Sequence, residues 1–285
     1  MNSDYQQFYN TVMEYYGEYG RHDLPWRKKQ TAYSVLVSEI MLQQTQVDRV
    51  IPFFMNWMKL FPDLQELADA PQTEVLKQWK GLGYNSRALR LQKCAQKLVK
   101  DHKGKIPRSY EKLLALPGVG PYTAAAVMNF AYNIWTPLIE TNIRRIYIHH
   151  FFNNEKAVSD KDILEKVTKV GCYESPKIWC AALMDYGSTL PKIIQHNPNI
   201  KSKHYTKQSK FNGSDREIRG KILNILLQAK SHKISEVILF KKINTVIGSD
   251  NEVISKDQTE RYQKILVDLE KEGFLKKQKK SIILR

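Results

Sequence analysis

Two glutamates stand in sequence surroundings that suit them for opposite kinds of acid–base chemistry. Glu39 lies within the apolar segment Val37–Leu42. Burial of this helix would raise the pKa of Glu39 and keep it protonated near neutral pH, as a general acid requires. The alternative is an ordinary surface glutamate on a helix, which is the usual place for this residue type.

Glu140 directly precedes a predicted helix that starts near Thr141, and Arg144 and Arg145 follow close behind. The positive end of the helix dipole and the two arginines favour the ionised form of a carboxyl group at this position. We therefore expect a carboxylate that can stabilise positive charge. A role restricted to capping its own helix remains open.

A third feature is the stretch Leu116–Thr123, with the sequence L-P-G-V-G-P-Y-T, between two helical segments. Pro117 and Gly118 end the first segment, and Pro121 suits the first turn of the second. The glycines allow a tight turn that brings backbone N–H groups to the surface, where a helix start binds an anion such as a phosphate. An ordinary turn between two helices is the alternative.

The composition supports a folded chain with a polyanionic partner. A length of 285 residues suggests about two domains, and 42% hydrophobic residues can form buried cores. A formal net charge of +16 points to nucleic acid, although a basic protein without such a partner is the alternative. No run approaches the ~18 apolar residues of a membrane span, and the N-terminus lacks a leader pattern. We therefore expect an intracellular, cytoplasmic protein located with the genome.

The cysteines argue against a metal cofactor. The chain has three, Cys94, Cys172 and Cys180, and none follows residue 180. The last two are eight residues apart and form no C-x-x-C pair, so a metal site is not expected. An iron–sulfur cluster needs about four thiolates.

The elements that must position these residues are helical over residues 1–190. Apolar residues at helical spacing predict a series of helices there, without alternating strand patterns. Residues 191–214 are polar and lysine-rich and read as a basic linker. In residues 215–285 we predict three helices, at 215–228, 234–243 and 257–270, followed by two short strands at 274–284. This pattern suggests a winged-helix-like α+β domain.

The C-terminal part also concentrates the positive charge. Residues 201–285 hold 20 Lys and Arg against 10 Asp and Glu, a net of +10. A DNA-binding module is the favoured interpretation, and a protein-docking domain is the alternative.

Several blocks, taken together and in order, resemble the helix-hairpin-helix DNA glycosylase superfamily and, within it, the MutY-type adenine glycosylases. Besides the hairpin Leu116–Thr123, they are Leu24–Trp26, Ser38–Val47, Gly81–Tyr84 and Ala182–Gly187. The resemblance implies an endonuclease III-like helical core over residues 1–190. It also implies base flipping and hydrolysis of an N-glycosidic bond in base excision repair.

The resemblance assigns roles to the two glutamates. Glu39 matches the glutamate that protonates adenine, and Glu140 stands where the family has an aspartate that stabilises or captures the sugar cation. Glutamate is one methylene longer, and a misplacement of about 1 Å can cost ~10²-fold in rate. Asn142 resembles the supporting amide beside this acid. Tyr122 stands where bifunctional members have a lysine nucleophile, so a Schiff base cannot form there; its phenol contacts the flipped nucleotide or packs in the core.

Other positions are expected to contact double-stranded DNA. Gln44 and Tyr84 match residues that such enzymes push into the helix beside the target pair, where an aromatic ring stacks on bases. Tyr84 could instead be a simple turn aromatic. We also place at the DNA Gly118, Gly120, Thr123 and Arg87, which complete the predicted site.

Three departures from the family bear on cofactor and substrate. The four-cysteine iron–sulfur loop of most members is absent after Gly187, so we expect no cluster and no other cofactor. Ala181 aligns with a glutamine that helps to read adenine, and the tail does not resemble the family's 8-oxoguanine-reading domain. We therefore expect a monomeric, monofunctional glycosylase for adenine opposite 8-oxoguanine or guanine. A glycosylase for thymine, uracil or 5-hydroxymethyluracil, or a non-catalytic DNA-binding protein, remains the alternative.

Overall fold

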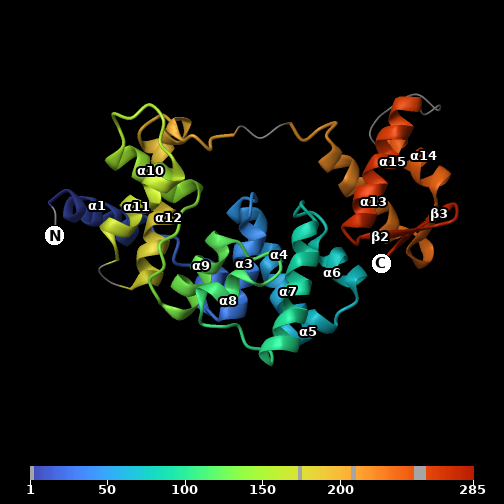
Figure 1. Cartoon of the computed structure of the whole chain (residues 1–285), viewed down its shortest axis with the longest axis horizontal. Coiled ribbons are helices and arrows are strands. Elements are labelled where there is room, and N and C mark those ends of the chain that lie inside the picture. Colours follow the sequence, from blue (N-terminus) through green and yellow to red (C-terminus); the bar gives the residue numbers. More distant parts are fainter. Residues whose placement is uncertain (1–2, 173–174, 207–209, 247–254) are drawn as a thin grey trace. The chain divides into compact units, whose positions relative to one another are not determined.

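The computed structural model describes residues 3–172, 175–206, 210–246 and 255–285, and the described elements are mostly helices (Figure 1). This confirms the predicted mainly helical fold with a small C-terminal sheet. Up to residue 207 the helices are α1 (Ser3–Tyr19), α2 (Pro25–Lys28), α3 (Ala32–Leu42), α4 (Val47–Leu60), α5 (Leu64–Asp69), α6 (Gln72–Trp79), α7 (Ser86–His102), α8 (Tyr110–Leu114), α9 (Pro121–Tyr132), α10 (Thr141–Phe151), α11 (Asp160–Val170), α12 (Pro176–Ile193) and the 3₁₀ helix η1 (Pro198–Lys201). The later elements are α13 (Asp215–Gln228), the 3₁₀ helix η2 (Lys230–His232), β1 (Lys233–Ser235), α14 (Glu236–Val246), α15 (Lys256–Lys271), β2 (Leu275–Gln278) and β3 (Ser281–Leu284).

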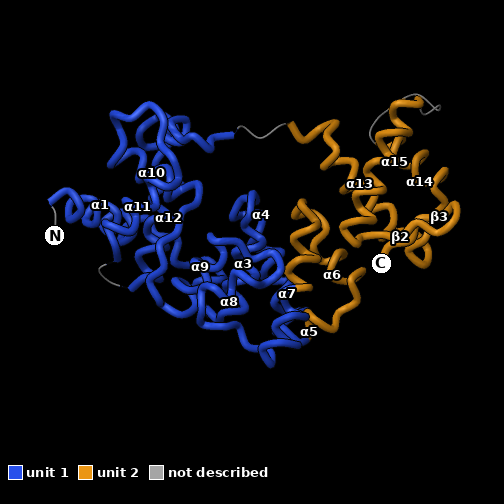
Figure 2. The backbone as a smooth tube through the Cα atoms, viewed as in Figure 1, with its two compact units in different colours: residues 1–65, 94–207 blue, residues 66–93, 208–285 orange. Residues whose placement is uncertain are grey.

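The chain forms two compact units, which Figure 2 distinguishes by colour. Unit 1 comprises residues 1–65 and 94–207, and unit 2 comprises residues 66–93 and 208–285. The predicted division into 1–190, 191–214 and 215–285 stays a prediction. The first part of the predicted linker nevertheless has regular structure, because α12 continues through Pro191 to Ile193. Residues 207–209 of that linker lie outside the described residues.

Residues 199–203 of the predicted linker belong to unit 1 and are held there by hydrogen bonds. The N–H of Val158 donates to the carbonyl of Lys201 at 2.8 Å, and the N–H of Lys203 donates to the carbonyl of Val158 at 2.9 Å. The side chain of Asn199 is buried and donates to the carbonyl of Thr141 at 2.9 Å. These contacts attach the segment to the first turn of α10 through Thr141 and to the residues before α11 through Val158.

Two helices with little polar surface form the centre of unit 1. Nine of the eleven residues of α3 are buried, and eight successive residues of α9 are buried. A helix that is apolar on all sides is stable only when other elements surround it. α3 packs against α9 and α4, and α12 packs against α9, α10 and α1. Thr31 begins α3 with a capping box to Ser34, so the helix start is fixed before the first buried turn.

Unit 2 contains a small antiparallel sheet with strand order β1-β3-β2. The helices α13, α14 and α15 contribute buried apolar side chains, among them Ile222, Leu239 and Leu269, and Ile282 of β3 is fully buried. The predicted helix at 234–243 is wrong at its start, because Ile234 lies in β1 and pairs with Ile282. A three-residue strand is too short to show an alternating pattern, and its partner strand is distant in the sequence. The winged-helix interpretation and the DNA-binding role of this part stay predictions.

None of the helices in the described residues is both long enough and apolar enough to cross a membrane.

Candidate active site

Glu39 lies inside unit 1. It belongs to α3, and only 6% of its surface is exposed, so the interpretation as a surface glutamate is wrong. Burial raises the pKa of Glu39 to about 7, the hydrogen bond from Tyr122 lowers it, and the nearby charge of Glu140 raises it further. The carboxyl group is therefore poised to hold or release a proton at neutral pH, as predicted from its apolar surroundings.

Tyr122 is the direct partner of Glu39. It lies in the first turn of α9, and its hydroxyl donates a hydrogen bond of 2.6 Å to Oε2 of Glu39. Burial and the neighbouring charges of Glu39 and Glu140 raise the pKa of the phenol well above its ordinary value. Tyr122 therefore stays a neutral hydrogen-bond donor, and its role as a partner of the acid was not foreseen.

Glu140 begins α10 and folds back onto the helix start. Its Oε1 accepts hydrogen bonds from the N–H groups of Asn142 at 2.7 Å and Ile143 at 2.8 Å. The Asn142 side chain donates to Oε2 at 3.2 Å, which agrees with its predicted supporting role. The carboxyl group thus caps the helix and also lies close enough to Glu39 to influence its pKa.

The electrostatics of Glu140 differ from the prediction. Burial raises its pKa above the ordinary value, whereas the N–H groups of the helix start and the charges of Arg145 and Arg144 lower it. The predicted lowering influences are therefore present, but the loss of water outweighs them. Sequence reasoning located the helix start correctly and missed the degree of burial.

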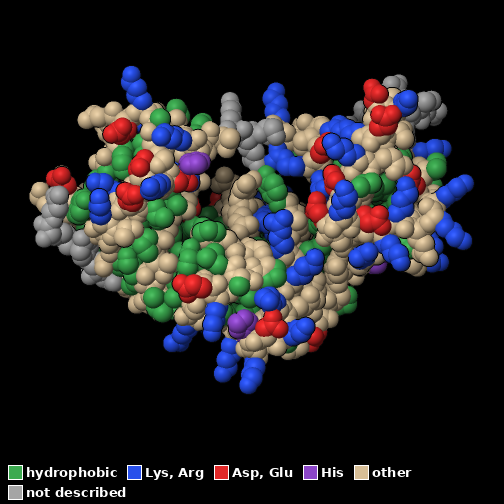
Figure 3. Space-filling view, in the orientation of Figure 1, with side chains coloured by type: hydrophobic (Ala, Val, Ile, Leu, Met, Phe, Trp, Pro, Cys, Tyr) green, Lys and Arg blue, Asp and Glu red, His purple; other side chains and the backbone are tan. Residues whose placement is uncertain are grey.

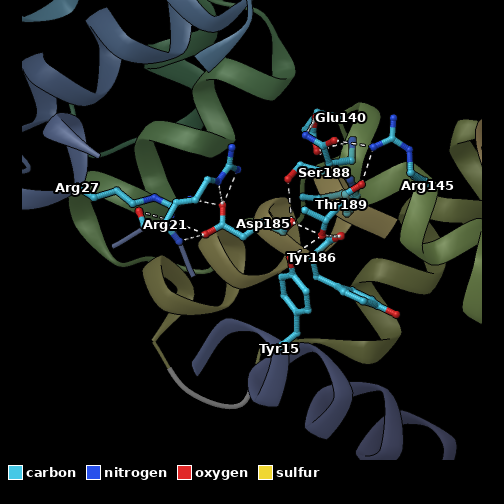
Figure 4. Close-up of polar contacts among 12 residues, drawn as sticks. Tyr15, Arg21, Arg27, Glu140, Arg145, Asp185, Tyr186, Ser188 and Thr189 are labelled. Atoms are coloured by element: carbon cyan, nitrogen blue, oxygen red, sulfur yellow. Dashed lines mark hydrogen bonds and ion pairs between the residues drawn. The ribbon is translucent and has the colours of Figure 1, made fainter. Parts of the chain in front are cut away.

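The start of α10 is fixed against α12 through Arg145 and Gly187, as Figure 4 shows for Arg145 beside Glu140. Arg145 donates to the side chain of Asn142 at 2.9 Å and also to the carbonyl of Gly187. A Cβ atom at Gly187 would lie 2.5 Å from the carbonyl oxygen of Asn142. A glycine is therefore required for α12 to approach this closely.

A second buried carboxylate, Asp185 of α12, binds two arginines from near the start of α2 (Figure 4). Arg21 donates to it from its backbone N–H at 2.8 Å and from Nε at 2.7 Å, and Arg27 donates at 2.7 and 2.9 Å. Burial raises the pKa of Asp185, but the hydrogen bonds and charges of the arginines lower it by more. The pKa of Asp185 therefore lies below its ordinary value. The sequence did not predict this cluster. The available signals were Arg27 directly after the block Leu24–Trp26 and Asp185 inside the block Ala182–Gly187.

The hairpin between α8 and α9 has the predicted backbone. Gly118 adopts a φ of +78°, and Gly120 precedes α9, whose start has no side-chain cap. A Cβ atom at Gly120 would meet nothing within 4 Å, so this side of the turn is open. Thr123 differs from the prediction: it is buried, and its hydroxyl lies 3.5 Å from the Gln43 side chain as an acceptor. The hairpin can offer N–H groups to a phosphate, but Thr123 faces the interior.

The remaining predicted DNA contacts lie on two loops in different units. In unit 1, Gln44 is exposed with a φ of +55°. In unit 2, Tyr84 is 37% exposed with a φ of +47°, and its hydroxyl accepts a hydrogen bond of 2.7 Å from Arg216 of α13. Both residues are therefore exposed and have a positive φ, which is uncommon for residues other than glycine. Arg216 was not predicted, because nothing in the sequence links α13 to this loop.

Arg87 has a structural role that sequence reasoning missed. Its side chain is buried and donates to the carbonyls of Leu82 at 3.2 Å and Gly83 at 3.0 Å. Its guanidinium lies 5.3 Å from the centre of the Trp79 ring and 5.6 Å from that of Tyr84. Burial lowers the pKa of Arg87 to about 10. Arg87 supports the loop that presents Tyr84, rather than extending from it.

The residues that follow Gly187 do not fit the iron–sulfur cluster of the wider family. This segment continues α12 with Ser188, Thr189 and Leu190, and no cysteine follows it in the sequence. Among the described residues, no group of three or more His, Cys, Asp or Glu side chains has a metal-binding arrangement. Ala181, aligned with the adenine-reading glutamine, is buried in the same helix.

Comparison with known proteins gives consistent matches. A family model described as HhH-GPD superfamily base excision DNA repair protein matches residues 37–172. Adenine DNA glycosylase of Mycolicibacterium smegmatis is 34% identical over 227 residues, which cover 73% of this chain and 77% of that protein. Adenine DNA glycosylase of Buchnera aphidicola subsp. Baizongia pistaciae is 36% identical over 198 residues, covering 67% of this chain and 54% of that protein.

Among solved structures, a thermostable thymine-DNA glycosylase matches with a TM-score of 0.59 and 26% identity. The match covers 66% of this chain and 87% of that one. The chain thus spans about half the length of the Buchnera relative and most of the length of the solved structure.

Proposed function

Because the chain belongs to the HhH-GPD superfamily of base excision DNA repair proteins, we propose that it is a DNA glycosylase that removes adenine opposite 8-oxoguanine or guanine. The relatives named adenine DNA glycosylase support this substrate. The observation that carries the chemistry is the buried Glu39, with a pKa near 7 and a hydrogen bond from Tyr122. The flipped base is the group that this acid protonates.

Glu39 acts as the general acid. Since Tyr122 donates to Oε2, a proton on the carboxyl group resides on Oε1 and can pass to a ring nitrogen of adenine. The bond between the base and C1′ of the sugar then breaks, and its electron pair goes to the protonated base. Proton transfer of this kind contributes about 10²- to 10⁴-fold in rate.

Glu140 stabilises the sugar that remains. Its Oε1 is held by two backbone N–H groups, whereas Oε2 has the longer bond from Asn142. Oε2 is therefore the oxygen that faces positive charge on the sugar, either as a stabilising anion or as a nucleophile. Water then adds to C1′ and releases a proton, which leaves an abasic site.

The enzyme is monofunctional and cuts no strand. Tyr122 supplies a phenol, which cannot form the imine that strand-cleaving relatives make with a lysine. The hairpin amides of Gly118 and Gly120 hold a DNA phosphate. Gln44 and Tyr84 enter the duplex beside the target pair, and Arg216 orients the Tyr84 ring through its hydroxyl. The protein acts as a monomer without an iron–sulfur cluster, in the compartment that holds the genome.

Single-turnover base release from a panel of duplexes tests the proposal. The panel holds adenine opposite 8-oxoguanine and guanine, and thymine, uracil and 5-hydroxymethyluracil opposite guanine, with alkali added to cut abasic sites. We expect adenine release and no cleavage without alkali. Release of a pyrimidine alone would mean that Ala181 marks a changed pocket, and equal rates for wild type and Glu39→Gln would indicate a non-catalytic DNA-binding protein. Stoichiometric iron in the purified protein would contradict the cluster-free proposal.

A further inference from the structure

The sheet of unit 2 has one face toward the core and one face toward solvent. Ile282 and Leu284 of β3 are buried, so the alternate residue Ile283 points to the opposite face. In the antiparallel register, Ile283 pairs with Lys233 of β1 on one side and Lys276 of β2 on the other. Residues directly opposite in neighbouring strands share a face. Two exposed lysines therefore flank Ile283 on the outer face.

Two more lysines form the turn between β2 and β3. Gln278 pairs with Ser281, which leaves Lys279 and Lys280 as a two-residue turn. Lys279 has a φ of +54°, where asparagine or glycine is the favoured residue. Lys279 therefore occupies a turn position whose backbone conformation disfavours lysine. We call Lys233, Lys276, Lys279 and Lys280 together the lysine face.

The positive charge of the lysine face is not neutralised within unit 2. All four side chains are exposed, and over the described residues none of them forms an ion pair. Lys277, between them in sequence, pairs instead with Glu236 at 2.7 Å. Lysine and arginine side chains are frequent on the surface around the unit 2 elements in Figure 3. Four like charges held together repel one another, and a polyanion relieves that repulsion.

We propose that the lysine face binds the phosphate backbone of duplex DNA independently of its sequence. The inference rests on the proposed function in one respect, which is that duplex DNA is the substrate. Lysine ammonium groups are compact point charges on flexible stems, which suit contacts with phosphate oxygens. DNA offers one negative charge per about 1.7 Å of helix axis, a density that four neighbouring lysines can use. The lysine face thus gives the protein affinity for undamaged duplex.

The salt dependence of binding to an undamaged duplex tests this proposal. The variant Lys233→Gln/Lys276→Gln/Lys279→Gln/Lys280→Gln removes four charges and leaves the buried face of the sheet intact. Each lost phosphate contact lowers the slope of log K against log salt by about 0.9, so we expect the slope to fall by about 3 to 4. At 50 mM salt the affinity should fall by at least about tenfold. Undamaged duplex has no base to release, so this result is independent of the adenine assignment.

A matched variant on the helices of the same unit provides the control. Lys241→Gln/Lys242→Gln/Lys256→Gln/Lys264→Gln removes the same charge from α14 and α15 and should keep the wild-type slope. If this variant loses as much slope as the first, or the first keeps the wild-type slope, the lysine face is not the DNA contact. If the first variant loses binding to an acidic peptide but binds DNA as the wild type does, the lysine face contacts a protein partner and the proposal is overturned.

Lysine footprinting gives a second readout. It uses only the wild-type protein, so it does not depend on a variant that folds. Acetylation with and without duplex DNA, followed by mass spectrometry of peptides, should show protection at Lys276, Lys279 and Lys280. Lys241 and Lys242 should react equally in both samples. Equal acetylation of the β2–β3 turn with and without DNA would refute the proposal.

Discussion

Two buried carboxyl groups in unit 1 have pKa values that are shifted in opposite directions. On α3, Glu39 is 6% exposed, and burial raises its pKa to about 7. On α12, Asp185 is 2% exposed, yet its pKa is lowered. Burial alone therefore does not decide whether a carboxyl group in this protein is neutral or charged.

The difference lies in the hydrogen-bond donors that each carboxyl group meets. Among the described residues, Glu39 accepts one side-chain hydrogen bond, from the neutral Tyr122. Asp185 accepts hydrogen bonds from the charged guanidinium groups of both Arg21 and Arg27. A neutral donor leaves most of the desolvation cost in place, whereas two guanidinium groups outweigh it. Glu39 can thus hold a proton near neutral pH, whereas Asp185 keeps a negative charge that ties α12 to Arg21 and Arg27.

The largest expected effect comes from removing the proton donor. Glu39→Gln preserves the shape of the side chain and an acceptor for Tyr122 but cannot release a proton. We expect single-turnover base release to fall by about 10²- to 10⁴-fold. The control is an unchanged far-ultraviolet circular dichroism spectrum, and a rate within a few-fold of wild type would exclude Glu39 as the acid.

The same variant should alter the pH dependence of stability. Because the folded-state pKa of Glu39 is raised from 4.5 to about 7, its carboxyl group favours the folded state below pH 4.5 and loses that contribution as pH rises to about 7. The full loss corresponds to roughly 3 kcal/mol. Glu39→Gln should therefore match wild type at pH 4.5 and exceed it in free energy of unfolding at pH 8. Urea unfolding at both pH values measures this, and a variant less stable than wild type at pH 8 would contradict it.

Asp185→Asn should show the opposite behaviour. Neutralising this carboxylate leaves Arg21 and Arg27 without their anionic partner, and Arg27 is largely buried. Removing one member of a buried ion pair costs about 3–5 kcal/mol, and the partial exposure of Arg21 reduces this to about 2 kcal/mol. Because the pKa of Asp185 is lowered in the fold, its stabilisation is present above its unfolded pKa of about 4 and is lost at lower pH. The difference from wild type in urea unfolding should therefore shrink from pH 7 to pH 3; a constant difference would argue for lost packing instead.

The smallest expected effect is a change in the pKa of Glu39. Tyr122→Phe removes the hydrogen bond that lowers the pKa of Glu39, so that pKa should rise above about 7. The alkaline decline of single-turnover base release should then move to higher pH, by less than about one pH unit. A decline at lower pH than in wild type would show that Tyr122 supports the protonated form instead.

Local sequence patterns predicted the elements that carry the chemistry. The apolar context of Glu39 indicated a helix there, and the P-G-V-G-P turn and the helix start at Glu140 indicated where α9 and α10 begin. The predicted resemblance to helix-hairpin-helix glycosylases is confirmed by the family match. Each of these signals is contained within about one helical turn, where neighbouring residues determine backbone geometry.

Contacts between distant residues were not predictable in the same way. The bond from Tyr122 to Glu39 spans 83 positions, and the contacts of Asp185 with Arg21 and Arg27 span 164 and 158. Arg87 is a different case, because its contacts with Leu82 and Gly83 are local, and the sequence did not show that its side chain turns inward beneath its own loop. Which side chains face solvent and which meet a distant partner depends on how the helices pack. A local pattern in a single sequence does not show that packing.

Gly187 fixes how closely α12 approaches the start of α10. Its missing side chain lets the backbone of α12 rest directly on the backbone of Asn142, beside the Glu140 carboxyl group. Side chains can rotate to absorb a small error, whereas two touching main chains cannot. The backbone contact between Gly187 and Asn142 therefore fixes the position of Glu140 relative to α12. Gly187 does this although it has no side chain.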